Sequence, residues 1–354
     1  MATHNLIRWL LDTRELWLDN FSSQVRSAKD LHKVKSSLKF TGADAKHQAS
    51  FPLECLKPDE QQAIGRYYRA QDKKMSLGSY LLKYLVVART CRVPWPEIQI
   101  VGGEHKKPCY RPRDASSPGV EFNISHQAGL VAVAAHPGTS IKVGVDIVCV
   151  NERNDLARID ENGFDSWVDM YEEMFSDREL NDIKYSVNGV RLEDGTEISG
   201  GQLGDLARSC SRYESVCVSL TSGEKKCFSS GVIVEAKLRR FYAFWSLKEA
   251  YIKMSGEALL ADWLRDLEFR NVRTPKPKLA QEAASGNGFG ETVRDVEVFF
   301  RGEVVSDVSM ELQAFEEQYM IVTAISPTTP NGRGVFPEFE ILDLEKDIYP
   351  LAAT

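Results

Sequence analysis

Two apolar runs in the first half of the chain, separated by a turn, constrain the fold more than any other feature of the sequence. Leu130 to Ala135 and Ile141 to Val150 are rich in β-branched and small apolar residues, and Pro137 with Gly138 lies between them. Such runs are typical of buried strands bounded by a turn. The second run carries a single acid, Asp146, in its middle. We therefore predict a strand from which one carboxylate emerges among apolar residues.

Helical patterns surround these strands. Residues 60 to 87 and 237 to 254 place apolar side chains at helical spacing, and Gly256 ends the second pattern. The first pattern has a basic side, formed by Arg66, Arg69, Lys73, Lys74 and Lys83. The last third alternates apolar and polar residues at 295 to 300 and 319 to 325, as antiparallel strands do. The order of elements predicts an α+β fold of two pseudo-symmetric halves, each an antiparallel sheet packed on a long helix, with the active site at their junction.

The division between these halves is predicted at residues 143 and 144, so that the first half spans 1–143 and the second 144–345. With 354 residues the chain can bury a sizeable core. Residues 186–232 are rich in Gly, Ser and Thr and show little periodicity. We interpret them as an insertion or a mobile loop.

Composition excludes several classes of protein. A net charge of -7 argues against a binder of duplex DNA, and no apolar run reaches the roughly 18 residues that a membrane span needs. The first residues alternate apolar and charged side chains, unlike a secretory signal. Seven cysteines without a CxxC pair argue against a disulfide framework and against structural zinc. We expect a cytosolic monomer with reduced thiols that binds neither nucleic acid nor membrane.

Two acids are candidates for chemistry. A buried, unpaired Asp146 would cost several kcal/mol unless a metal or a cation offsets its charge, although an acid at a strand edge can also point to solvent. Glu249 and Lys253 lie one helical turn apart, with Trp245 a turn earlier on the same stripe. They could face one ligand together, but the same spacing is that of an ordinary exposed salt pair.

Two further segments offer donors for a phosphate. Ser125 and His126 follow an apolar segment that begins at Phe122, and Lys107 belongs to a turn-rich basic loop. Each has an ordinary alternative, because a histidine after a strand is often structural and charged surface loops are common. No single feature decides the function.

Taken in order, however, these segments resemble the signature of the Sfp-type 4'-phosphopantetheinyl transferases. After the basic helix come KKPC (106–109), FNISH (122–126), GVDI (144–147), FSDRE (175–179) and WSLKEAYIK (245–253). Every block of the family pattern has its counterpart here, and an ordered match of this kind is specific. It covers roughly residues 60–270, and the likeness is greatest to the broad-specificity fungal enzymes of the family.

The resemblance implies a role for each matching residue. Asp146 and Glu249 correspond to ligands of Mg²⁺, for which Mn²⁺ could substitute, at the diphosphate of coenzyme A; Glu249 is also the candidate base, and Lys253 completes the catalytic set. The remaining contacts to coenzyme A are expected from Lys107, Ser125, His126, Lys248, Lys253, Arg66, Lys73 and Lys74. Many bacterial relatives carry a second acid where this chain has Val148. Water or the amide of Gln127 is expected to take that ligand's place.

The implied reaction transfers the 4'-phosphopantetheine arm of coenzyme A to a serine hydroxyl of an apo carrier protein, with adenosine 3',5'-bisphosphate as the second product. Acyl carrier and peptidyl carrier proteins and domains of polyketide or fatty acid synthases are the expected partners. Because carriers are usually acidic around the modified serine, docking is expected on a patch of apolar and basic residues near the junction of the halves. A catalytically silent binder is the alternative, which the loss of Asp146, Glu249 or Lys253 would have favoured. A nucleotide enzyme of another kind lacks support, since no GxxxxGK[ST] or GxGxxG motif joins a strand to a helix.

Overall fold

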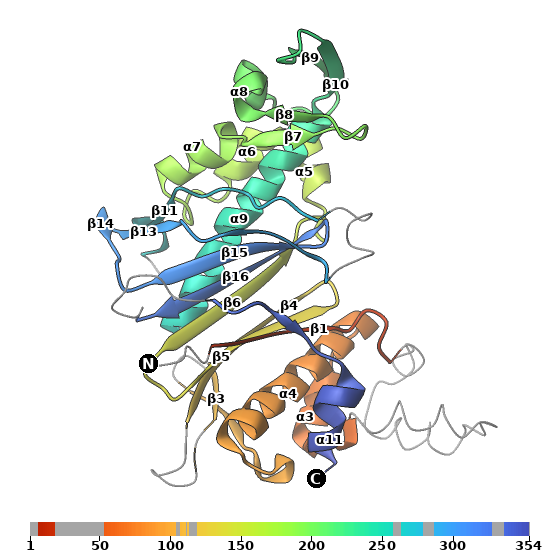
Figure 1. The fold of residues 1–354 in the computed structure, drawn as a ribbon, viewed down its shortest axis with the longest axis vertical. Helices are drawn as coiled ribbons and strands as arrows, with labels where there is room; N and C mark the ends of the chain where they lie inside the picture. Colours follow the sequence, from red (N-terminus) through yellow and green to blue (C-terminus); the bar gives the residue numbers. More distant parts are fainter. Residues whose placement is uncertain are drawn as a thin grey trace, which may run out of the picture.

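The computed structural model describes residues 6–17, 53–103, 107–110, 112, 119–257, 263–278, 287–327 and 336–353. Two sheets lie side by side in the middle of the molecule, and one long helix covers the outer side of each (Figure 1). The predicted α+β class with antiparallel sheets is confirmed. No helix in these ranges is both long enough and apolar enough to span a bilayer.

The first sheet has the strand order β17-β1-β5-β4. Its strands are β1 (Ile7–Asp12), β4 (Val120–Gln127), β5 (Leu130–Pro137) and β17 (Glu340–Ile341). Only the β1–β17 pair is parallel; the other pairs are antiparallel. The small apolar residues of β5 are buried on both faces, because Val131 and Val133 pack in the core under the helices while Leu130 and Ala132 pack toward the second sheet.

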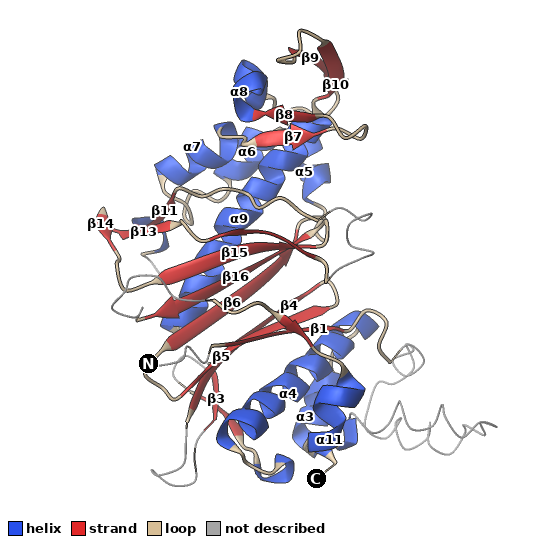
Figure 2. Ribbon diagram, viewed as in Figure 1, coloured by secondary structure: helices blue, strands red, loops and turns tan. Residues whose placement is uncertain are grey.

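Helices cover the outer face of this sheet, as Figure 2 shows. The basic helical pattern forms α3 (Pro58–Gly65) and α4 (Ala70–Cys91), and the chain end adds α11 (Tyr349–Ala352). Short elements complete this side of the molecule: the 3₁₀ turn η1 (Trp95–Glu97), the hairpin of β2 (Ile100–Gly102) and β3 (Pro108–Tyr110), and the π-helical turn η5 (Leu344–Ile348).

The second sheet is antiparallel throughout, in the order β12-β15-β16-β6. Its strands are β6 (Lys142–Cys149), β12 (Phe289–Val293), β15 (Ser309–Phe315) and β16 (Tyr319–Ser326). The long helix α9 (Gly231–Ser255) packs on it and ends at Gly256, whose φ of 83° permits the left-handed turn that stops the helix. Along β6, Val145 and Ile147 face the core between the sheets, whereas Val148 packs in the core around α9.

Smaller elements surround α9. They are the helices α5 (Asp155–Asn162), α6 (Phe164–Asp169) and α7 (Asp177–Tyr185), the 3₁₀ turn η4 (Leu264–Asp266), and a sheet of β11 (Leu267–Arg270), β13 (Glu297–Phe300) and β14 (Glu303–Val304). The pseudo-symmetry of the two halves and their division at residue 143 stay predictions.

Residues 186–232 contain more structure than the sequence indicated. They form β7 (Gly189–Arg191), β8 (Glu197–Ser199), α8 (Gly200–Leu203), η3 (Gly204–Arg208), β9 (Ser215–Ser219) and β10 (Lys225–Ser229). Val190, Ile198, Leu203 and Val218 belong to a small separate core beneath these elements. The interpretation as a loop was therefore wrong, because strands of three to five residues are too short to produce a clear period. Whether the insertion is mobile stays a prediction.

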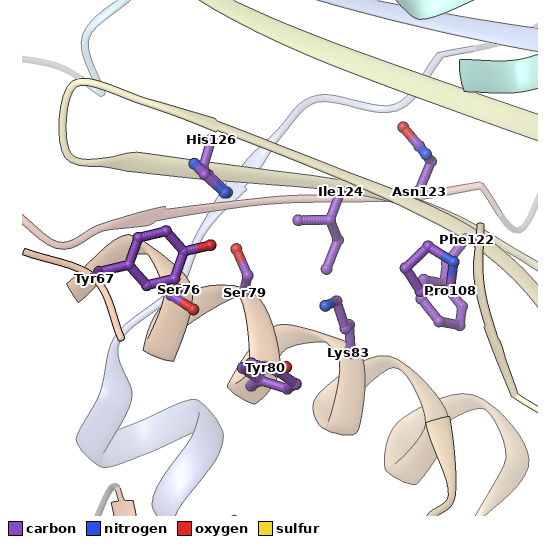
Figure 3. Close-up of a pocket in the computed structure, with 10 residues that line it drawn as sticks. All are labelled: Tyr67, Ser76, Ser79, Tyr80, Lys83, Pro108, Phe122, Asn123, Ile124 and His126. Carbon is purple, nitrogen blue, oxygen red and sulfur yellow. The ribbon is translucent and has the colours of Figure 1, made fainter. Parts of the chain in front are cut away.

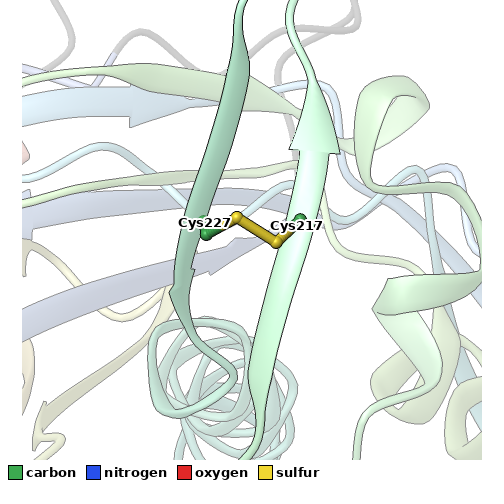
Figure 4. Close-up of a disulfide and its surroundings, with 2 residues drawn as sticks. All are labelled: Cys217 and Cys227. Carbon is green, nitrogen blue, oxygen red and sulfur yellow. A yellow bond between two sulfur atoms is a disulfide. The ribbon is translucent and has the colours of Figure 1, made fainter.

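A disulfide joins Cys217 and Cys227 in this insertion (Figure 4). The two residues lie directly opposite each other in the β9–β10 hairpin, with their Cα atoms 4.1 Å apart. The expectation that all seven cysteines are reduced is wrong for this pair, since pairing across a hairpin cannot be read from the number of cysteines. Within the described ranges, no group of three or more His, Cys, Asp or Glu side chains gathers as a metal site would.

Candidate active site

The two sheets meet through side chains of β4 that replace a backbone ladder. Alternate residues of this strand accept hydrogen bonds from backbone N–H groups of β6: Asn123 Oδ1 from Val145 at 2.9 Å, Ser125 Oγ from Ile147 at 3.3 Å and Gln127 Oε1 from Cys149 at 3.1 Å. Because side chains alternate along a strand, the same spacing of two directs all three toward β6. The FNISH and GVDI segments are thereby held in a defined register.

Asp146 lies at this junction with only 5% of its surface exposed. Its Oδ1 accepts hydrogen bonds from Ser125 Oγ at 3.0 Å and from Lys253 Nζ at 2.6 Å, and Lys253 also donates to Ser125 Oγ at 2.9 Å. Its Oδ2 is buried without a hydrogen-bond partner among the described residues. The three residues come from β4, β6 and α9, so the fold brings together side chains that are up to 128 positions apart.

Glycine at position 144 allows α9 to approach β6 closely enough for this contact. A Cβ atom at Gly144 would stand 2.1 Å from the carbonyl oxygen of Ala250 and 2.9 Å from Cβ of Met254. No side chain fits at such distances without separating the helix from the strand. Asp146, two residues further along the same face of β6, is therefore brought beside the turn of α9 that carries Glu249 and Lys253.

Glu249 is the second buried acid of the site, with 7% of its surface exposed. Burial, and then the negative charge of Asp146, raise its pKa to about 7, while Lys253 and Arg153 oppose the shift. That the two acids share one divalent ion stays a prediction. A carboxylate with a pKa near neutrality can accept a proton at physiological pH.

The donor set suits a hard divalent cation. Mg²⁺ takes oxygen ligands, keeps several waters, and is commonly held by one or two protein carboxylates together with the phosphates of a substrate. Asp146 Oδ2 and the Glu249 carboxylate are the two acidic groups available for it here. Val148 has no ligand atom, and the Gln127 amide oxygen already accepts a hydrogen bond from the Cys149 N–H at 3.1 Å, so a metal contact of Gln127 stays a prediction.

Lys248 does not join this site, contrary to the role expected for it. Its side chain is completely buried and forms an ion pair with Glu179 at 2.9 Å. Its ammonium group also donates to the backbone oxygens of Leu264, at 2.9 Å, and Leu267. Three acceptors in a closed environment leave this lysine no way to reach a diphosphate at the surface. The correction is that Lys248 holds α9 against α7 and β11.

The FSDRE segment provides the other half of that contact. Ser176 is the N-cap of α7, and its hydroxyl accepts a hydrogen bond from the Glu179 N–H at 3.2 Å. In return Glu179 accepts from the Ser176 N–H at 2.9 Å, and it also accepts from the Phe269 N–H at 2.9 Å. Glu179 therefore caps its own helix while it pairs with Lys248.

A cavity of about 200 Å³ lies between α4 and β4 (Figure 3). It is close to Asp146 and Glu249, which we call the acidic cluster. Lys83 and Tyr80 of α4 line it opposite His126 of β4, and the Lys83 ammonium stands 4.5 Å from the Tyr80 ring centre. Ser79 contributes a buried hydroxyl without a hydrogen-bond partner among the described residues. Burial lowers the pKa of Lys83, and Glu60 partly offsets this. A cation and four hydroxyl-bearing side chains thus surround a space of ligand size: Lys83 with Tyr67, Ser76, Ser79 and Tyr80.

His126 stands at the rim of this cavity and is exposed. Desolvation by the surrounding protein, followed by the positive charges of Lys253 and Lys83, lowers its pKa. Ser125, which lies between the lining residues Ile124 and His126, is hydrogen-bonded to Asp146 and Lys253, so the cavity and these charged residues are neighbours. A phosphate beside these groups would favour the protonated imidazole, since an anion reverses the effect of the two lysines.

The other basic residues expected at coenzyme A do not line the cavity. Arg66 is exposed, whereas Lys73 and Lys74 are buried, and Lys74 donates to the backbone oxygen of Arg14 at 3.1 Å. Lys107 forms an ion pair with Glu121 and donates to the Val143 oxygen at 3.3 Å. Lys106 and His105 lie outside the described residues.

Two candidate residues were missing from the sequence-based site. Lys83 was predicted on the basic side of its helix, and its spacing of four from Ser79 and three from Tyr80 would have placed it on their face. Arg153 stands over the Trp245 ring, 5.4 Å from its centre, and acts electrostatically on Glu249. No pattern in the sequence indicates it, because it follows β6 in an irregular turn.

Comparisons with known proteins agree with the geometry. Residues 43–138 match a family described as "4'-phosphopantetheinyl transferase, N-terminal", and residues 209–301 match the "4'-phosphopantetheinyl transferase superfamily". The chain is 42% identical to a 4'-phosphopantetheinyl transferase of Aureobasidium melanogenum over 98% of its length and 97% of the relative's. It is 33% identical to 4'-phosphopantetheinyl transferase A of Aspergillus fumigatus, covering 98% and 94% of the two chains. It is 35% identical to 4'-phosphopantetheinyl transferase NpgA of Emericella nidulans, covering 86% and 90%.

Proposed function

We propose how this chain acts from the premise that it belongs to the 4'-phosphopantetheinyl transferase superfamily. It transfers the 4'-phosphopantetheine arm of coenzyme A to a serine hydroxyl of an apo carrier protein and releases adenosine 3',5'-bisphosphate. The observation that carries the proposal is the pair of buried acids, Asp146 and Glu249, beside Lys253 at the contact of β4, β6 and α9. A silent binding module would have no need to maintain such a costly arrangement.

Glu249 is the proposed general base. Its pKa of about 7 allows it to take the proton from the carrier serine as the serine oxygen bonds to the phosphorus that bears the pantetheine arm. The bond from that phosphorus to the bridging oxygen breaks, and the electron pair leaves with adenosine 3',5'-bisphosphate. Lys253, oriented by Ser125 and Asp146, faces the charge that develops on the diphosphate oxygens.

Asp146 and Glu249 are the proposed holders of Mg²⁺, for which Mn²⁺ could substitute. The bound ion supplies neutralisation of the diphosphate charge. The chain's own contribution is to hold Asp146 rigidly through Ser125 and to keep the site largely closed to water. Exclusion of water strengthens the electrostatic contacts and protects the diphosphate from hydrolysis.

The cavity between α4 and β4 is the proposed place of the nucleotide end of coenzyme A. His126 and Lys83 provide cationic or donor groups for a phosphate, and Tyr80 offers an aromatic face. Ser125 separates this cavity from Asp146, and Lys107 is held nearby by Glu121. We propose that the diphosphate extends from the cavity to Lys253, with the active site at the junction of two pseudo-symmetric halves that divide near residue 143.

Mass spectrometry of the carrier tests the proposal directly. Purified protein, coenzyme A, Mg²⁺ and an apo carrier domain should yield a carrier heavier by one phosphopantetheine, and omission of any of the first three should prevent the change. Glu249→Gln should lower kcat about 10²- to 10⁴-fold, as removal of a general base does. Glu303→Gln changes an exposed glutamate of β14 and serves as the matched control. Unmodified carrier in the complete mixture, across several carrier classes, would contradict the function.

A further inference from the structure

A cleft of about 1310 Å³ lies between the insertion and the body of the molecule. The first half of α9, the β7–β8 hairpin, the segment 273–278 and the start of β12 line it. Apolar side chains such as Val190, Val232 and Leu156 alternate with charged ones along its walls. The proposed chemistry uses none of these walls.

The charge of the cleft is opposite in sign to that of the chain. Seven basic side chains and four glutamates line it; Arg240 and Arg273 pair with Asp182 and Asp295 outside the lining, which leaves a surplus of one positive charge in a chain whose net charge is -7. Arg191 and Lys276 are exposed, with their nearest acid, Glu197, 4.0 Å and 3.1 Å away. A concentration of one sign on an oppositely charged protein attracts a partner of complementary charge.

Arg239 in this cleft has donors that find no acceptor. Its Nη1 donates to the Glu317 oxygen at 2.7 Å, whereas Nε and Nη2 are buried and unpaired among the described residues. Burial lowers its pKa to about 10, partly opposed by Glu317. A guanidinium in such a position costs stability unless an anion binds it, because its fork of donors matches a carboxylate.

The cleft reaches the catalytic acids at one end. Arg153 lines the cleft and stands over the Trp245 ring, 5.4 Å from its centre, and Trp245 lies one helical turn before Glu249. Arg239 lies ten residues before Glu249 on the same helix, a rise of about 15 Å. A partner that places a side chain at Glu249 can therefore contact Arg239 with a neighbouring surface.

We infer that this cleft is where the carrier protein docks, and that an acidic, amphipathic face of the carrier beside its target serine occupies it. The inference rests on the proposed transferase function. The apolar walls would bury the apolar side of that face, while Arg191, Arg239 and Lys278 meet its carboxylates. The insertion would then select carriers, a task separate from binding coenzyme A at α4 and β4.

Transfer kinetics with purified carrier domain test the inference. Charge reversal in the double variant Arg191→Glu/Lys278→Glu should raise KM for the carrier about tenfold, with KM for coenzyme A unchanged and a weaker dependence on salt. Arg239→Gln should also raise KM for the carrier, yet leave Tm equal or higher, because it removes a guanidinium with two buried nitrogens that have no acceptor among the described residues. Lys225→Glu, at an exposed lysine of β10 outside the cleft, is the matched control and should behave as wild type.

The outcomes separate the two proposals. If wild type modifies the carrier and the cleft variants keep its KM, or if Lys225→Glu has an equal effect, docking in the cleft is wrong while the transferase function stands. If wild type modifies no carrier, the function fails, and fluorescence anisotropy of labelled apo carrier still decides the inference. Binding that the double variant weakens supports the cleft; absence of binding, or equal binding to both proteins, overturns it.

Discussion

Replacement of Lys248 distinguishes the structural role that we find for this residue from the diphosphate contact that its motif implies. Lys248 and Glu179 both have fully buried side chains, and their charged atoms are 2.9 Å apart. Lys248→Met would leave the Glu179 carboxylate buried with two backbone N–H donors but no cation, and two carbonyl groups without their donor. Breaking a buried pair in this way costs about 3 to 5 kcal/mol.

Urea unfolding followed by tryptophan fluorescence measures this loss. The free energy of unfolding should fall by about 3 to 5 kcal/mol, whereas folded Lys248→Met should keep a KM for coenzyme A near that of wild type. Lys253→Met supplies the comparison, because its side chain is partly exposed and contacts Asp146. It should lower kcat strongly and cost less stability than Lys248→Met, because Lys253 is partly exposed and Ser125 still donates to Asp146. The double variant Glu179→Gln/Lys248→Met should lose less stability than the single changes summed, since it removes both charges.

The reverse pattern of stability and KM would refute the structural role of Lys248. If Lys248→Met unfolds at the wild-type urea concentration and raises KM for coenzyme A, the ion pair with Glu179 is not what holds this lysine. A diphosphate contact would then have to compete successfully with a buried carboxylate. Measurement of both quantities on the same preparation excludes partial unfolding as the cause of a raised KM.

Three further predictions follow from the geometry. The folded-state pKa of Glu249, about 7, exceeds its ordinary value of 4.5, so the neutral acid favours folding and stability is lost as pH rises from 4.5 to 7. This loss, about 3 kcal/mol at most, should be absent in Glu249→Gln when both are unfolded in EDTA. Gly144→Ala should lower Tm and abolish transfer, because its Cβ would meet the Ala250 oxygen at 2.1 Å; wild-type Tm would contradict this. Reduction of the Cys217–Cys227 bond should destabilise the insertion locally by about 2 to 3 kcal/mol, seen as faster proteolysis of its β9–β10 turn and absent if the hairpin is held by other contacts.

Much of the architecture was predictable because long apolar patterns determine it. The β5 and β6 strands, the helix that ends at Gly256 and the antiparallel pairs of the last third all lie close to their predicted positions. Each carries a run long enough to bury a continuous face. The insertion was missed for the opposite reason: its strands are short, and its small core becomes apolar only when β7, β8 and α8 come together.

The residues of the candidate site could likewise be predicted only in part. Asp146, Ser125 and Lys253 could be named from motifs, and the structure brings them within hydrogen-bond distance. The basic residues of α4 could not be sorted, because helical spacing shows which side chains share a face but not which face meets β4. Lys83 lines the cavity, whereas Lys74 is directed to the Arg14 carbonyl.

Each motif contains both residues that hold the fold and residues that belong to the site. This explains why a diphosphate contact was wrongly predicted for Lys248. In FNISH, Asn123 serves the contact with β6, while Ser125 serves both that contact and Asp146. In the helix motif, Lys248 belongs to the packing of α9 and its neighbour Glu249 to the acidic cluster. Adjacent residues of a helix point about 100° apart, so one cannot face the core beside Glu179 while the next shares its surroundings. A residue inside a catalytic motif therefore needs its helix face established before it is given a catalytic role.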